Sequence, residues 1–182
     1  MAAVKLLEMP SEGTAAVYRE AEKHFGHVPN LVKALGPNTN MCNSITRFMI
    51  QSLGEGRVSW AFKELVILKT LRVMKSHYSY GAHEKLASQL GVPKEKLADI
   101  ANSLWQKSPH FSEGERLVFE LVDQIGKDAN DVKPALWDAL KKHWGHGQLI
   151  EINAVITTFL MIGRVGDALG VVDDILFSKP LN

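Results

Sequence analysis

The chain has 182 residues, which is enough for one domain with a sizeable core, or for such a domain with a short arm. Its 21 basic and 20 acidic residues are mixed along the sequence and give a net charge of +1, so nothing indicates nucleic acid or an anionic membrane as a partner. A single cysteine, Cys42, excludes an internal disulfide and a zinc site made of cysteines alone.

The beginning of the chain lacks the pattern of a signal peptide. The most apolar stretch, residues 149–163, is interrupted by Glu151 and Asn153 and falls short of the roughly 20 residues that a membrane span needs. We therefore expect a soluble, cytoplasmic protein that makes no membrane contact.

The first part of the chain predicts helices. Residues 11–25 and 30–35 fit helical spacing and are each followed by glycine. A third helix, capped by Asn38 or Asn40, is expected to run to about residue 53. Its expected inner face consists of Met41, Ile45, Phe48, Met49 and Ser52.

A helix over residues 60–75, with Ser59 as its expected cap, places a carboxylate in the core. At 100° per residue Glu64 shares one stripe with apolar side chains, whereas Lys63, Lys69 and Arg72 point elsewhere. Burial disfavours the charged form of a carboxylate. Glu64 must therefore be neutralised, paired or used in chemistry.

The next segment supplies possible partners for Glu64. If a second helix begins near Ser76, then Ser76, Ser79, Tyr80 and His83 fall within roughly 100° of arc. His83 then faces the same interior as Glu64. On composition alone, His83 is equally explained as a core histidine bonded to a backbone carbonyl, and Glu64 as half of a structural ion pair.

The remaining segments also predict helices, over residues 94–105, 112–125, 131–144 and 149–169. Ser112 with Glu115 is typical of a capping box, and Pro134 suits a first helical turn. The last helix is apolar around most of its circumference, which indicates burial in the bundle centre or between subunits. Together the elements predict an all-α protein, a compact bundle of seven or eight helices, with residues 1–27 as an N-terminal helical arm and 28–182 as the main domain.

The spacing of Glu64, Ser76, Ser79 and His83 resembles that of the glutamate, two cysteines and histidine of alkyl hydroperoxidase D, in the carboxymuconolactone decarboxylase superfamily. Both cysteines are serine here. The segment ELVILKTLRVMKSHYSYGAH looks still more like the cysteine-free branch of this superfamily. It departs from that branch at two positions, because Ser79 stands where an acidic residue is usual and Tyr80 where a tryptophan is usual. The resemblance covers about residues 28–172 and implies the alkyl hydroperoxidase D-like fold and a homo-oligomer.

The resemblance implies a cofactor-free lyase that transfers protons on, or decarboxylates, a small organic acid or lactone. Glu64 and His83 would be the acid and base, and Ser76, Ser79 and Tyr80 would donate hydrogen bonds to a developing oxyanion. Candidate substrate-binding residues are Arg72, Lys69, Tyr78 and Glu151. Tyr78 is equally expected to pack on another helix or subunit, and Glu151 to pair with Arg164 or Lys142.

Two other functions fit the same scaffold. A thiol peroxidase needs a peroxidatic and a resolving thiol, which Ser76 and Ser79 cannot supply, so this function would depend on Cys42. A non-catalytic oligomeric protein that binds a small ligand is the other alternative. Metal binding is not expected, because the pairs His24 with His27 and His143 with His146 lack a third ligand and each spans a glycine turn.

Overall fold

The computed structural model describes residues 2–76 and 79–171, and these residues form an all-α structure. Its helices are α1 (Ala15–Phe25), α2 (Asn30–Leu35), α3 (Thr39–Ser52), α4 (Trp60–Met74), α5 (Tyr80–Gln89), α6 (Lys94–Ala101), α7 (Glu113–Asp128), the 3₁₀ turn η1 (Ala129–Asp131), α8 (Pro134–Leu140) and α9 (His146–Leu169). The all-α prediction is confirmed. Within the described residues there are nine α-helices, where seven or eight were expected.

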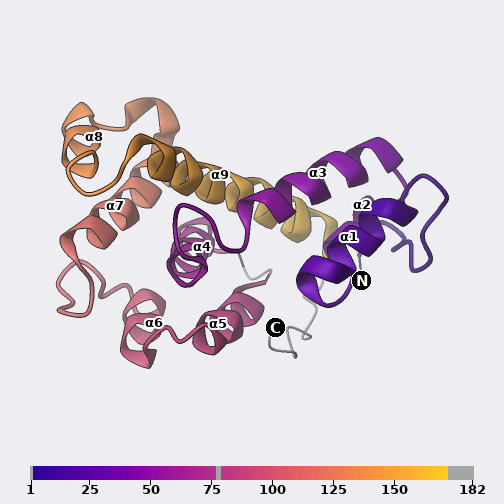
Figure 1. Ribbon diagram of the computed structural model, residues 1–182, viewed down its shortest axis with the longest axis horizontal. Helices are drawn as coiled ribbons and strands as arrows, with labels where there is room; N and C mark the ends of the chain where they lie inside the picture. The colour runs from indigo at the N-terminus through magenta and orange to yellow at the C-terminus, as the bar shows by residue number, and fades with distance from the viewer. Residues whose placement is uncertain (1, 77–78, 172–182) are drawn as a thin grey trace.

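Helix α4 is the centre of the fold. Figure 1 shows it in front of the long helix α9, with α1 to α3 towards one end of the molecule and α7 and α8 towards the other. Helices α5, α6, α7 and α9 all pack against α4. As a result Lys63 and Lys69 are buried together with Glu64, on faces of the helix that the sequence pattern assigned away from the core stripe.

Helix α9 is longer than expected, because it begins at His146 rather than near residue 149. By length and composition alone its 24 residues could cross a membrane. Half of its most apolar window is buried inside the fold, mainly against α4 and α3, and core helices of globular proteins have the same composition. Helix α9 is thus half-buried, and α4 occupies the bundle centre.

The N-terminal helices pack on α3, with a different face from the expected one. The buried side chains of α3 include Cys42, Thr46 and Met49, whereas Met41 and Phe48 are 47% and 45% exposed. The predicted inner face was therefore wrong at Met41 and Phe48. The reason is that α3 is covered by α1, α2 and α9, so its buried face is set by three neighbours that the pattern of one helix cannot reveal.

Helix starts agree well with the predicted caps. The side chains of Asn38, Ser59 and Ser112 accept hydrogen bonds from backbone N–H groups three residues later, at 3.2, 3.4 and 3.2 Å. Glu115 completes the capping box by accepting from the Ser112 N–H at 2.8 Å. Local sequence signals therefore determine where α3, α4 and α7 begin.

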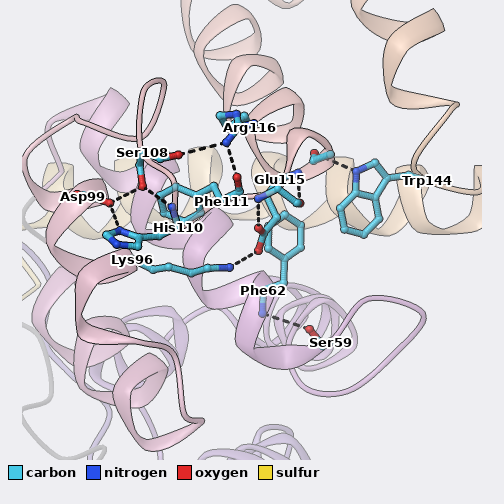
Figure 2. Close-up of polar contacts among 12 residues, drawn as sticks. Ser59, Phe62, Lys96, Asp99, Ser108, His110, Phe111, Glu115, Arg116 and Trp144 are labelled. Atoms are coloured by element: carbon cyan, nitrogen blue, oxygen red, sulfur yellow. Dashed lines mark hydrogen bonds and ion pairs between the residues drawn. The ribbon is translucent and has the colours of Figure 1, made fainter.

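A polar network holds the connection between α6 and α7. Figure 2 shows Asp99 of α6 receiving hydrogen bonds from Ser108 and His110, at 2.6 and 2.8 Å between heavy atoms. Arg116 of α7 donates to the carbonyl oxygens of Ser108 and Phe111. These contacts fix the loop on which α7 packs back against α4.

Candidate functional site

Glu64 is fully buried on α4, and both of its carboxylate oxygens have a partner. Oε2 lies 2.6 Å from Nδ1 of His83, and Oε1 accepts a hydrogen bond of 2.8 Å from the indole nitrogen of Trp60. A carboxylate removed from water needs such partners, because its desolvation is otherwise costly. The structure therefore brings Glu64 and His83 together, as the sequence predicted.

His83 is positioned by its own helix and by α9. Its backbone N–H donates to the carbonyl of Ser79 at 3.0 Å, and its imidazole packs edge-on against Phe159, with ring centroids 4.8 Å apart. Only 4% of the residue is exposed. Since Nδ1 faces Glu64, a proton exchanged with a substrate would pass through Nε2.

A hollow of about 510 Å³ is lined by Leu71, Arg72, Lys75, Ser76 and Tyr80, and Tyr80 precedes His83 by three residues on α5. Its volume lies within the range of small-molecule sites, roughly 300–1,000 Å³. Arg72 and Lys75 are exposed and bring two positive charges to the lining. This combination favours a small anionic ligand.

Two hydroxyl groups in the lining have no hydrogen-bond partner among the described residues: Oγ of Ser76 and the phenol oxygen of Tyr80. Burial raises the pKa of Tyr80, with a further increase from Glu84 that Arg72 opposes, so the phenol is protonated at neutral pH. An unpaired buried hydroxyl costs about 1–3 kcal/mol. Both residues thus line the hollow and keep a hydroxyl donor that no described residue uses.

Helix α9 lies close both to Ser76, which lines the hollow, and to His83. A Cβ atom placed on Gly163 would lie 3.3 Å from Oγ of Ser76, and Phe159, four residues earlier, contacts His83. Ser76 and His83 thus meet α9 one helical turn apart. Glu64 and His83 are themselves buried, and the described lining is formed by their neighbours.

The backbone route that joins these residues differs from the prediction. Helix α5 begins at Tyr80 and not near Ser76, so the expected common helical arc was wrong. Lys75 and Ser79 both adopt left-handed backbone conformations, with φ of 56° and 61°. Two sharp turns therefore bring Ser76 and Tyr80 to the same hollow, and Ser79 is a buried residue just before α5.

Lys69 does not reach this hollow. Its ammonium group pairs with Asp123 of α7 and lies 5.0 Å from the centroid of the Trp105 ring. The prediction of Lys69 as a substrate-binding cation is corrected on this ground, since position 69 faces α7. Arg72 does line the hollow, and Lys75, which sequence reasoning missed, lines it as well.

Glu151 is engaged elsewhere. It pairs with the buried ammonium group of Lys63 and accepts a hydrogen bond of 2.9 Å from the backbone N–H of Arg57. Its partner is therefore neither Arg164 nor Lys142, and these contacts suit a structural role better than substrate binding. Tyr78 lies outside the described residues.

Sequence reasoning also missed the role of Trp60. Trp60 lies four residues before Glu64 on α4, and its indole N–H donates to the carboxylate. The spacing of four residues on one helix was the available signal, because such residues are neighbours on the helix surface.

Among the described residues, no group of three or more His, Cys, Asp and Glu side chains is placed to hold a metal ion. His24 instead stacks on Trp60, with ring centroids 6.1 Å apart. Its partner in the H-x-x-H pair, His27, lies within hydrogen-bond distance of the carbonyl of Phe25, at 3.2 Å.

No protein-family profile and no curated protein sequence matches the chain. Solved structures do. An uncharacterized peroxidase-related protein from Silicibacter sp. TM1040 superposes with a TM-score of 0.81 at 20% identity, covering 100% of this chain and 96% of that chain. A second solved structure comes from Ralstonia eutropha JMP134 and is described as an alkylhydroperoxidase AhpD core and uncharacterized peroxidase-related protein. It superposes with a TM-score of 0.79 at 17% identity, covering 96% of this chain and 92% of that chain.

The debrominase Bmp8, in its C82A form in complex with 2,3,4-tribromopyrrole, superposes with a TM-score of 0.78 at 16% identity, covering 96% of this chain and 95% of that chain. Proteins of this shape thus include one that is described as a debrominase, in complex with a halogenated pyrrole. At such low identity the likeness concerns the fold. The chain has the alkyl hydroperoxidase D-like fold.

Proposed function

We propose that this protein is a cofactor-free enzyme of the carboxymuconolactone decarboxylase type that transfers protons on a small organic acid or lactone. The observation that carries the proposal is the buried contact of 2.6 Å between Glu64 Oε2 and His83 Nδ1. General acid–base catalysis requires an acid and a base held in a fixed geometry. A ligand-sized hollow lined by Ser76 and Tyr80, which are close in sequence to His83, supports the proposal.

Each residue has a role in the proposed reaction. His83 takes a proton from carbon next to the substrate carbonyl through Nε2, and Glu64 stabilises the imidazolium that results. Ser76 and Tyr80 donate hydrogen bonds to the enolate oxygen on which negative charge develops. Arg72 and Lys75 attract the substrate carboxylate, and His83 returns the proton to complete the cycle.

A thiol peroxidase is disfavoured, although solved structures of this shape are described as peroxidase-related. The sole cysteine, Cys42, is fully buried on α3 and packs with Val17, Tyr18 and Val32. Burial raises the pKa of Cys42, so its thiol is protonated at neutral pH. Ser76 and Ser79 occupy the positions where a peroxidase of this kind has thiols.

The test is solvent deuterium exchange, followed by ¹H NMR, on 4-oxopentanoate, 2-oxoglutarate and 5-oxotetrahydrofuran-2-carboxylate. We expect catalysed loss of the C–H signal next to the carbonyl, and at least about 100-fold slower exchange in Glu64→Gln and His83→Gln. Butanone, which lacks the carboxylate of 4-oxopentanoate, should exchange much more slowly.

Glu120→Gln on the exposed side of α7 and His110→Gln are matched controls, since they change a carboxylate and an imidazole outside the buried pair and the hollow. Both should keep the rate of the unmodified protein. Exchange that persists undiminished in Glu64→Gln and His83→Gln would refute the proposed acid and base. Failure to catalyse exchange of any panel compound, despite their binding, would favour the non-catalytic ligand-binding protein instead.

A further inference from the structure

Trp60 is the first residue of α4 and lies one turn before Glu64. Its indole nitrogen donates a hydrogen bond of 2.8 Å to Oε1 of Glu64, the oxygen that does not face His83. The proposed reaction assigns no role to this contact. It nevertheless engages one of the two oxygen atoms of the buried carboxylate.

An indole N–H can donate but never accept a hydrogen bond. Oε1 of Glu64 must therefore remain an acceptor as long as Trp60 is bonded to it. If Glu64 carries a proton, that proton must be on Oε2, in the contact of 2.6 Å with Nδ1 of His83. We infer that Trp60 is a positioning residue, which confines the mobile proton of the pair to the line between Glu64 Oε2 and His83 Nδ1.

The inference rests on the proposed function for its catalytic consequence, but the confinement itself is a property of the folded protein. Without the indole donor, Oε1 could also take the proton, and the carboxyl group could rotate about its own bond. The acid would then be misplaced for part of the time, and His83 would lose its fixed partner. Turnover, more than substrate binding, should suffer.

The rest of the structure holds Trp60 in the required orientation. His24 of α1 stacks on the indole ring with an interplanar angle of 26°, and Ser59 caps the helix turn on which Trp60 lies. Burial lowers the pKa of His24, which favours its neutral form against the ring. Helix α1 is thereby linked to the buried pair through one aromatic contact.

A first experiment needs no substrate. The chain has four tryptophans, so a ¹H–¹⁵N spectrum should show four indole signals, with that of Trp60 identified by its loss in Trp60→Phe. Because a carboxylate is a stronger acceptor than an amide, Glu64→Gln should move the Trp60 indole proton upfield by at least about 0.3 ppm. The signal of Trp144, whose indole bonds to the carbonyl of Gly114 at 3.0 Å, should stay in place. A Trp60 signal that does not move in Glu64→Gln would overturn the inference.

A second experiment measures exchange kinetics on the panel compound that turns over fastest. Trp60→Phe should lower kcat about 10-fold and leave KM within about 2-fold, because the change affects proton placement and not substrate contacts. His24→Ala should lower kcat less, and Trp144→Phe should leave kcat unchanged. If Glu64→Gln and His83→Gln abolish exchange while a folded Trp60→Phe keeps full kcat, the positioning role is refuted and the proposed function stands.

Discussion

Lys63 and Glu151 form an ion pair that joins the central helix α4 to the long helix α9. Lys63 is 1% exposed, and its ammonium group also donates to the carbonyl of Gly54 at 2.9 Å. Glu151 in turn holds the backbone of Arg57. The pair therefore fixes the loop between α3 and α4, from which α4 enters the core and carries Glu64 to His83.

Breaking this pair should destabilise the protein. Glu151→Gln leaves the Lys63 charge buried without its counter-ion, which should lower the free energy of unfolding by about 3 kcal/mol, as measured by urea denaturation. The double variant Lys63→Met/Glu151→Gln should lose less, because no lone charge remains buried. Asp131→Asn, which removes an exposed pair with Lys133, is the control and should have little effect. A loss below about 0.5 kcal/mol in Glu151→Gln would contradict a structural role for the pair.

Gly163 should be needed for the close approach of α9 to Ser76, which lines the hollow. A Cβ atom there would lie 3.1 Å from the Met74 terminal methyl and 3.3 Å from Oγ of Ser76. The methyl can move, and alanine gains up to about 1 kcal/mol of helix propensity over glycine, so Gly163→Ala should fold with a Tm close to the original. Its exchange rate should nevertheless fall, because Ser76 is displaced.

The matched control is Gly81→Ala on α5, where no atom lies within 4 Å of the added carbon. It should raise Tm slightly and leave exchange unchanged. Equal exchange rates in Gly163→Ala and Gly81→Ala would show that the position of Ser76 does not matter for the reaction.

Cys42 should be chemically inert in the folded protein. Its thiol is fully buried, its pKa is raised by burial, and its sulfur lies 3.6 Å from the carbonyl oxygen of Val32. We expect no reaction with Ellman's reagent at pH 7.5 until denaturant is added, and the same low peroxide consumption in Cys42→Ala as in the unmodified protein. Rapid labelling of the native thiol, or peroxide reduction that Cys42→Ala abolishes, would revive the peroxidase alternative.

Asp99 should make a contribution to the stability of the folded protein that is lost at acid pH. Hydrogen bonds from Ser108 and then His110 lower the pKa of Asp99 in the folded state. Its contribution to stability is therefore present above the unfolded value of about 3.9 and is lost as the pH falls through the lower folded value. Asp99→Asn should be less stable than the unmodified protein at pH 7, and this difference should shrink below about pH 4.

Thermal unfolding from pH 7 to pH 2.5 measures this difference. Asp138→Asn on the surface of α8 is the control, and its difference from the unmodified protein should be small throughout. A difference for Asp99→Asn that is unchanged between pH 7 and pH 2.5 would show that the network in Figure 2 does not depend on the charge of Asp99.

Local signals predicted the helices, and non-local packing decided what they bury. Caps such as Asn38 and Ser59 act within one turn, so the sequence places the helix starts correctly. The side on which Met41 lies depends on where α1, α2 and α9 pack against α3, which no helical period encodes. The same limit applies to Lys69, whose partner Asp123 is 54 residues away.

The predicted contact between Glu64 and His83 is present, whereas the predicted path of the backbone between them was wrong. The spacing of Glu64 and His83 matches a known motif, and this match was sufficient to predict their contact. The left-handed turns at Lys75 and Ser79 were not visible, because neither residue is glycine and positive φ is uncommon for other residues. The sequence therefore predicted a helix from about Ser76, although α5 begins at Tyr80.

The most direct test of the account is a double-mutant cycle on Glu64 and His83, using kcat/KM for deuterium exchange on the fastest panel compound. A pair that passes one proton works as a unit, so Glu64→Gln/His83→Gln should be no slower than the slower single variant. Losses that simply multiply in the double variant would show that the two residues act independently, and would contradict the proposed proton-transfer pair.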